Sequence, residues 1–215
     1  MFSALVPDRG LTVGTRVPSI DPKWLHSFAL RLTSGNEEGG ISVGIVSSEH
    51  GEGTTTIVVN LAECLARSLD RTVAVVDANL RSPALGSVYG LPPGPGLMDL
   101  IEGGASIRDA LYTRPGGKIC VIPTGKPSGV SHCWGPPVAD LIDELAESFD
   151  VVLVDSAPVQ PYPDSRLLAR NLESVVLVLE AERAKWDAAA LSVQYLQESG
   201  ANVLGAVLNR RPARK

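Results

Sequence analysis

Lysine is missing from a long central part of the chain. The 215 residues include five lysines, and none of them lies between Trp24 and Gly117. Lys and Arg together number 19 and Asp and Glu number 24, which gives a net charge of −5. Coating nucleic acid, or binding a membrane surface by charge alone, requires an excess of basic residues. The composition therefore excludes a protein that coats nucleic acid and argues against membrane binding by charge alone, and we expect no nucleic-acid partner.

Long apolar runs and paired cysteines are also missing. No run approaches the roughly 18 residues of a transmembrane helix, and the first ten residues lack the basic segment of a signal peptide. We therefore expect no transmembrane segment of the chain's own. Its cysteines, Cys64, Cys120 and Cys133, show no C-x-x-C spacing and cannot all pair. They are typical of reduced thiols in a cytoplasmic protein.

Short apolar runs alternate with helical patterns along most of the chain. The apolar runs predict strands buried on both faces, at 41–47, 72–78, 118–123, 150–156, 174–180 and 201–209. The helical patterns predict helices at 22–33, 54–69, 136–148, 163–171 and 185–199. The Gly- and Pro-rich region 82–117 receives no assignment. The alternation predicts an α/β fold, a doubly wound, mostly parallel sheet of about six to seven strands flanked by helices.

A glycine-rich turn, SSEHGEGTTT (residues 47–56), joins the first predicted strand to a helix. Such a turn presents backbone N–H groups and a helix N-terminus to an anion, typically a phosphate. Gly51 and Gly53 let the backbone approach the anion closely, and Thr55 or Thr56 places a hydroxyl where Mg²⁺ would be held. The alternative is an ordinary tight turn between a strand and a helix.

Two aspartates end predicted strands. Asp77 lies at the carboxyl end of the second strand and Asp155 at that of the fourth. Ligands of an open α/β sheet bind outside the carboxyl ends of its strands, where hard carboxylates can reach Mg²⁺ through water. One such Asp is commonly a helix cap. Two of them beside a glycine-rich loop favour a nucleotide site.

These motifs resemble those of the bacterial tyrosine kinases, cytoplasmic P-loop domains that control capsule and exopolysaccharide assembly and are grouped with MinD/ParA-like ATPases. The family's Walker A region reads approximately T-S-x-x-P-G-x-G-K-S-T, then N-L-A. Its later motifs read D-x-D-[LM]-R-x-P, G-L-x-D-x-L, D-T-P-P-V with a later Asp, and G-V-V-L-N. Matching residues occur in order at 47–56, 60–62, 77–83, 96–101, 155–159, 164 and 205–209. The resemblance covers about residues 24–210.

The resemblance implies a P-loop NTPase fold that binds ATP or ADP with Mg²⁺. Its implied nucleotide-binding residues are Gly51, Glu52, Gly53, Thr54, Thr55, Thr56, Arg81 and Asn209, the last of them in the adenine pocket. Thr55, Asp77 and Asp155 would hold the metal, and the two aspartates would be catalytic in an active enzyme. We expect residues 1–21 to be a flexible N-terminal lead-in and residues 22–215 to be the P-loop NTPase-like domain.

The sequence departs from the family at positions that carry its chemistry. Thr54 stands where the Walker A lysine, which contacts the β- and γ-phosphates, is expected. Such a contact is worth on the order of 4 kcal/mol at an effective dielectric constant near 20, and losing part of it slows phosphoryl transfer roughly 10²–10³-fold. Asn79 replaces a second acid, and no tyrosine follows Tyr195. The sequence predicts a catalytically impaired regulator, a pseudokinase.

The resemblance also implies a partner and a location. The partner would be a polysaccharide co-polymerase-type inner-membrane protein, which would recruit the chain to the inner face of the plasma membrane, and a homo-oligomer stays open. The alternative function is an active ATPase or a protein-tyrosine kinase acting on a partner in trans, with a replacement cation from Arg81 or from another chain. A MinD/ParA-like positioning ATPase is a third hypothesis, but Ser47 and Ser48 stand where its signature lysine would lie.

Overall fold

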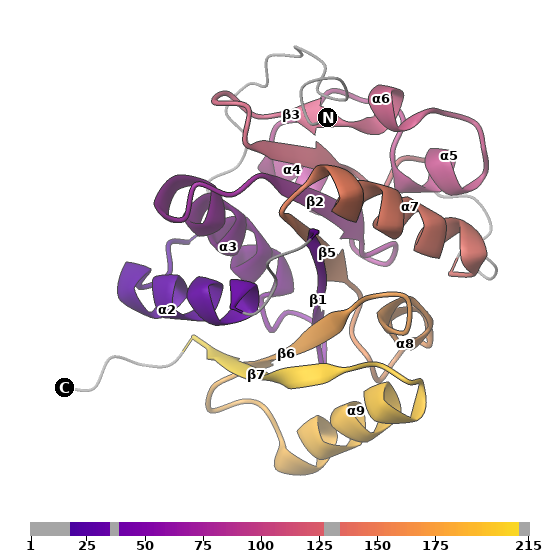
Figure 1. Cartoon of the computed structure of the whole chain (residues 1–215). Helices are drawn as coiled ribbons and strands as arrows, with labels where there is room; N and C mark the ends of the chain where they lie inside the picture. The colour runs from indigo at the N-terminus through magenta and orange to yellow at the C-terminus, as the bar shows by residue number, and fades with distance from the viewer. Residues whose placement is uncertain (1–17, 35–38, 127–133, 211–215) are drawn as a thin grey trace.

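The computed structural model describes residues 18–34, 39–126 and 134–210. Its strands form one seven-stranded sheet in the order β3-β4-β2-β5-β1-β6-β7 (Figure 1). All neighbouring strands are parallel except β3, which runs antiparallel to β4. This confirms the predicted fold class. The strands are β1 (Ile41–Ser47), β2 (Val73–Ala78), β3 (Tyr112–Thr113), β4 (Ile119–Ile122), β5 (Val151–Ser156), β6 (Ser174–Glu180) and β7 (Val203–Asn209).

Helices cover both faces of the sheet. One face packs against α2 (Pro22–Thr33), α3 (Thr54–Ser68) and α4 (Leu85–Val88). The other packs against α5 (Leu97–Ile101), α6 (Ile107–Ala110), α7 (Pro136–Ser148), α8 (Asp164–Ala169) and α9 (Trp186–Glu198). Within β2, Val73 and Val75 join the first core while Ala74 and Val76 join the second. Because both faces are covered, the strands read as continuous apolar runs.

The region left without assignment, 82–117, contains α4, α5, α6 and β3. Each has two to five residues, too few to show a periodic pattern. Carboxylates cap the N-termini of α5 and α6. Asp99 accepts a hydrogen bond from the Gly96 N–H (2.9 Å), and Asp109 accepts one from the Ser106 N–H (3.1 Å). The long elements begin and end within about two residues of their predicted bounds, which is the usual uncertainty of helix and strand ends.

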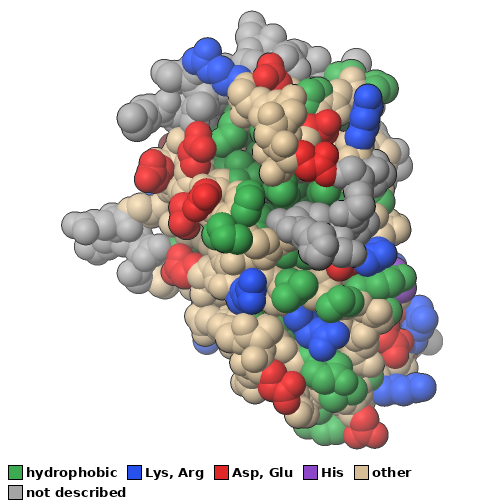
Figure 2. Space-filling model, turned by 90° about the vertical axis from the view of Figure 1, so that its right-hand side faces the viewer, with side chains coloured by type: hydrophobic (Ala, Val, Ile, Leu, Met, Phe, Trp, Pro, Cys, Tyr) green, Lys and Arg blue, Asp and Glu red, His purple; other side chains and the backbone are tan. Residues whose placement is uncertain are grey.

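Most of the predicted lead-in, residues 1–17, lies outside the described residues. The described part is attached to α3, because the Asn60 side chain donates to the Pro18 carbonyl (3.0 Å) and accepts from the Ile20 N–H (3.2 Å). Among the described residues, none of the helices is both long and apolar enough to span a bilayer. Figure 2 views the molecule from the right-hand side of Figure 1, and on that face hydrophobic side chains lie among acidic and basic ones.

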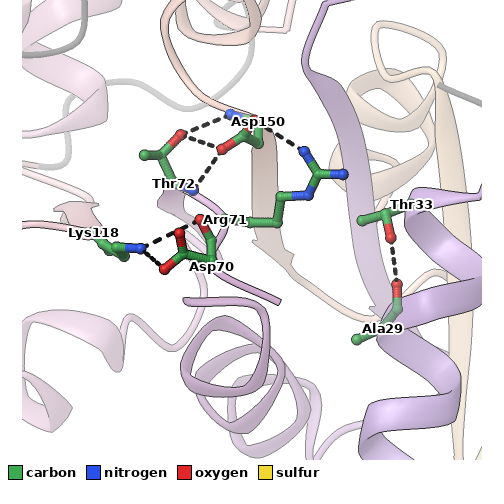
Figure 3. Close-up of polar contacts among 7 residues, drawn as sticks. All are labelled: Ala29, Thr33, Asp70, Arg71, Thr72, Lys118 and Asp150. Carbon is green, nitrogen blue, oxygen red and sulfur yellow. Dashed lines mark hydrogen bonds and ion pairs between the residues drawn. The ribbon is translucent and has the colours of Figure 1, made fainter. Parts of the chain in front are cut away.

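A polar cluster closes the amino ends of β2 and β5, opposite the end that carries the predicted site (Figure 3). The Asp150 carboxylate accepts hydrogen bonds from the Thr72 N–H and hydroxyl, both at 2.7 Å, and pairs with Arg71 at 3.4 Å. Burial tends to raise the pKa of Asp150, but the hydrogen bonds from Thr72 and the charge of Arg71 outweigh burial and hold that pKa below its ordinary value. Nearby, Asp70 pairs with Lys118 on the surface.

We predict that Asp150→Ala lowers the free energy of unfolding by about 1–3 kcal/mol, because two donors of Thr72 lose their acceptor. The lowered pKa means that this stabilisation is present above the ordinary Asp pKa and is lost as the pH falls below about 4. Denaturant unfolding at pH 7 and pH 3 measures it. Asp70→Asn is the control, since its carboxylate is 91% exposed and exposed pairs contribute about 0–1 kcal/mol. Equal effects of the two substitutions would contradict the prediction.

Candidate nucleotide site

The site is assembled by placing β5 between β1 and β2. Asp155 of β5 is in register with Asp77 of β2 on one side and with Ile45 of β1 on the other. The two carboxylates therefore lie side by side, at the sheet end where β1 runs into the glycine-rich loop. The hydroxyl of Thr55, in the first turn of α3, donates to Asp155 Oδ2 at 2.5 Å. The structure thus brings the loop and both predicted acids together.

Asp155 is completely buried. Burial and the neighbouring charge of Asp77 raise the pKa of Asp155 to about 7, against a smaller lowering by hydrogen bonds from the Thr55 and Thr54 hydroxyls. Its second oxygen, Oδ1, is buried without a hydrogen-bond partner. An unsatisfied carboxylate oxygen beside a second carboxylate and a threonine hydroxyl is a donor set that fits Mg²⁺. These residues therefore fit the implied metal.

Asp77 has a structural task as well. Its Oδ2 accepts hydrogen bonds from the N–H groups of Ala84 (3.0 Å) and Leu85 (2.9 Å), and its Oδ1 accepts one from Asn79 (3.2 Å). Burial raises the pKa of Asp77, and these hydrogen bonds oppose that rise. The carboxylate thus holds the turn that follows β2 and begins α4.

The side chain of Glu52 lies inside the loop. It is 4% exposed, and its Oε2 accepts hydrogen bonds from the N–H groups of Ser48 (2.8 Å) and Glu49 (2.9 Å). Its Oε1 accepts one from the N–H of Glu180 at the end of β6 (3.1 Å). Glu52 therefore shapes the loop and ties it to β6, a role that the local sequence pattern does not reveal.

Two loop glycines adopt left-handed backbone conformations, Gly51 with φ +82° and Gly53 with φ +97°. Space differs between them: a Cβ on Gly51 would meet no atom within 4 Å, whereas a Cβ on Gly53 would collide with the Asn209 amide. That amide donates to the Glu52 carbonyl at 2.8 Å. The structure thus places Asn209, at the end of β7, against the loop.

A cavity of about 190 Å³ opens at the loop. It is lined by Ser47, His50, Gly51, Gly53, Thr54, Thr55, Asn79, Ser82, Ala84, Pro158 and Arg210. Four of the eight residues implied for nucleotide binding are therefore in its wall, while Glu52, Thr56, Arg81 and Asn209 are not. Sequence reasoning missed Arg210 as a site residue, although it directly follows Asn209.

Arg81 is engaged elsewhere. Its Nε and Nη2 contact Asp164 Oδ2 at 2.8 Å and 2.7 Å, and its guanidinium lies 4.5 Å from the centre of the Tyr162 ring. The Asp164 side chain is 9% exposed, so breaking the pair would leave a nearly buried charge without compensation. Arg81 is therefore held by Asp164 rather than free to replace a lysine.

The raised pKa of Asp155 predicts an unusual pH dependence for Asp155→Asn. Between about pH 4 and pH 7 the folded wild type keeps a proton that the unfolded chain releases, so rising pH destabilises the wild type but not the variant. From pH 5 to pH 8 the difference in free energy of unfolding should shift by on the order of 2–3 kcal/mol in the variant's favour. Denaturant titrations without metal measure it.

The charge-matched control is Asp143→Asn, at an exposed position of α7. Its effect should stay within about 0.5 kcal/mol at both pH values. A pH-independent effect of Asp155→Asn would show that Asp155 is ionised throughout this range.

The loop geometry also predicts unequal effects of alanine at the two glycines. Gly51→Ala should lower the free energy of unfolding by roughly 1–2 kcal/mol, because alanine is strained in the left-handed conformation. Gly53→Ala should cost more, by on the order of a further 1 kcal/mol, because the loop or Asn209 must also move. Thermal unfolding of both variants tests this, and a loss at Gly51 equal to that at Gly53 would refute it.

Solved structures similar to this chain share the fold. The CapA2B2 chimera has TM-score 0.82 at 25% identity, covering 89% of this chain and 85% of that one. The kinase domain of Escherichia coli tyrosine kinase ETK has TM-score 0.81 at 21% identity, covering 94% and 86%. The cobyrinic acid a,c-diamide synthase of Mycobacterium smegmatis, solved with ADP and magnesium, has TM-score 0.65 at 16% identity, covering 80% and 76%.

Relatives by sequence include proteins of very different length. The tyrosine-protein kinase YwqD of Bacillus subtilis is 26% identical over a stretch that covers 99% of this chain and 93% of the length of YwqD. EpsB of Ralstonia solanacearum is 29% identical over 89% of this chain, and the succinoglycan biosynthesis transport protein ExoP of Rhizobium meliloti is 29% identical over 78%. The chain spans only 26% of EpsB and 22% of ExoP. No protein-family model matches it.

The sheet order, the loop after β1 and the paired acids define a protein with the P-loop NTPase fold. The relatives by sequence form a narrower group than that class: EpsB, CapB of Staphylococcus aureus, CpsD of Streptococcus agalactiae and YwqD are bacterial tyrosine-protein kinases, the first two putative ones. This confirms the resemblance found in the motifs.

Proposed function

We propose that the chain is a nucleotide-binding regulator of capsule or exopolysaccharide production with impaired phosphoryl transfer. One observation carries the proposal. The loop, Thr55 and the two acids lie together at one end of the sheet, as the proposed binding of Mg²⁺-nucleotide requires, while Thr54 occupies the first position of α3, where the homologous motif has lysine. The site would then retain groups for a metal and phosphates, but it has no lysine at Thr54 to stabilise a phosphoryl group in transfer.

We propose ATP or ADP with Mg²⁺ as the ligand. Backbone N–H groups of a glycine-rich loop at the start of a long helix bind phosphates without any side chain. When bound, Mg²⁺ would neutralise phosphate charge, and Thr55, Asp77 and Asp155 would hold it, in part through water. The unpartnered Asp155 Oδ1 supports this assignment. Gly51, Gly53 and Thr54 line the cavity, where the phosphates would lie.

The proposed mode of action is contact with a membrane partner. ExoP, a transport protein, is homologous to this chain over a small part of its own length, so a domain of this kind occurs joined to a larger transport component. We propose that this chain docks from the cytoplasm onto a polysaccharide co-polymerase and is recruited in that way to the inner face of the membrane. Nucleotide occupancy would then set the docked state.

A second candidate is an active ATPase or tyrosine kinase acting in trans. The Thr55–Asp155 contact favours it, because two of the residues proposed to hold Mg²⁺ lie in contact. Release of inorganic phosphate by wild type and Asp155→Asn separates the regulator from an active ATPase. Equal, near-background rates support the regulator, whereas a wild-type rate well above that of the variant supports the enzyme.

We predict that Thr54→Lys tightens Mg-ATP binding about tenfold to hundredfold, since a charge-assisted hydrogen bond contributes roughly 1.5–3 kcal/mol. Turnover should remain low because Asn79 still replaces the second acid. Titration calorimetry and phosphate release measure the two quantities. Thr54→Met, which has a similar length without the charge, is the matched control and should not tighten binding. Absence of wild-type binding at millimolar nucleotide would remove the nucleotide from the proposal.

A further inference from the structure

One arginine lines the cavity at the glycine-rich loop, at the end of the sheet. Among the described residues that line this cavity, Arg210 is the single Lys or Arg. It directly follows β7, whose last residue, Asn209, holds the Glu52 carbonyl of the loop at 2.8 Å. The phosphate loop and Arg210 are therefore joined through one short hydrogen-bonded connection, although more than 150 residues separate them in sequence.

The backbone of Arg210 is specialised. Its φ of +56° lies in the left-handed region, which non-glycine residues rarely occupy and which costs on the order of 1–2 kcal/mol. The Arg210 N–H donates to the Asn209 side-chain oxygen at 2.9 Å, which helps to hold this turn. The turn ends β7 at the loop, and the residue that follows the strand lines the cavity.

The side chain of Arg210 has a partner that it can leave. Its Nη1 lies 3.1 Å from Glu180 Oε1, while Glu180 Oε2 pairs with Arg183 at 2.8 Å. The Arg210 side chain is 53% exposed, in contrast to the 12% exposed carboxylate. Because Arg183 stays on Glu180, departure of Arg210 does not leave that carboxylate uncompensated.

We propose that Arg210 binds the phosphate chain of the nucleotide in place of the missing Walker A lysine, exchanging Glu180 for phosphate oxygens. The inference rests on the proposed nucleotide binding and names the residue that makes it possible. A guanidinium pairs with phosphate through two parallel hydrogen bonds. Arg81, the replacement cation that the sequence indicated, is outside the cavity wall and paired with Asp164.

The test compares variants of the full chain in titrations with Mg-ADP and with Mg-pyrophosphate, which lacks the base and ribose. Arg210→Gln should weaken both about tenfold to hundredfold, and Arg210→Lys should restore part of the loss. The control is Arg183→Gln, which also removes one positive charge from Glu180, at a residue outside the cavity wall. It should stay within about twofold of wild type, as expected for an exposed charge. Melting temperatures verify that each variant is folded.

Two further variants separate phosphate binding from a structural role. Glu180→Gln releases Arg210 and should tighten pyrophosphate binding; weakening equal to that of Arg210→Gln would show that the ion pair only holds the loop, and would overturn the proposal. In the Thr54→Lys background the effect of Arg210→Gln should shrink, because the lysine supplies the missing charge. An undiminished effect would overturn the replacement of lysine by Arg210.

The remaining outcomes are distinct. Wild-type binding that Arg210→Gln leaves unchanged overturns the role of Arg210 and leaves the proposed nucleotide binding standing. Weakened ADP binding with unchanged pyrophosphate binding assigns Arg210 to the base or ribose, which also overturns it. If wild type binds neither ADP nor pyrophosphate, the proposed nucleotide binding and the role of Arg210 fail together.

Discussion

The position of β5 between β1 and β2 is the constraint on which the site depends. Hydrogen bonding on both sides fixes its register, so Asp155 lies beside Asp77 and at the level where β1 gives way to the loop. Two adjacent buried carboxylates repel each other. The molecule offsets this with donors, the Thr55 hydroxyl for one acid and the backbone N–H groups of Ala84 and Leu85 for the other. The first turn of α3 therefore supplies a donor to Asp155, and the backbone at the start of α4 supplies donors to Asp77.

The sequence alone predicts those parts of the molecule that depend on local pattern. Strands such as β2 are continuous apolar runs because helices cover both sides of the sheet, and the acids are visible because they end such runs. The contacts of the Glu52 side chain could not be predicted from such a local pattern. Its carboxylate accepts from Ser48 nearby and also from Glu180, which is 128 residues away. The direction of its side chain is therefore set by the tertiary fold, and the motif gives only its position.

The positions of Arg81 and Arg210 also depend on the tertiary fold and could not be predicted from the local sequence. Arg81 lies within the second motif and reads as available to the site, but its partner Asp164 is 83 residues distant. Arg210 directly follows the last motif and is not indicated as a site residue by the sequence, yet β7 brings it to the loop that follows β1. The spacing of residues along the sequence reveals neither the contact of Arg81 with Asp164 nor the position of Arg210 at the loop. Parallel strands bring such residues together only through long crossover connections. The fold class was thus predictable from the sequence, whereas the arginine that lines the cavity was not.

The charges of the site explain why two departures from the homologous motifs occur together. With lysine absent at Thr54, an acid at Asn79 would add a third carboxylate to a pair whose pKa values are already raised by burial. Asn79 is 8% exposed and its side-chain oxygen accepts from the Ser82 N–H at 3.1 Å. An amide makes this contact without a charge. Loss of one cation and of one acid leaves the carboxylates of Asp77 and Asp155, a pair that a divalent ion balances. The two departures together thus leave the pair of carboxylates that the proposed metal and nucleotide binding would require.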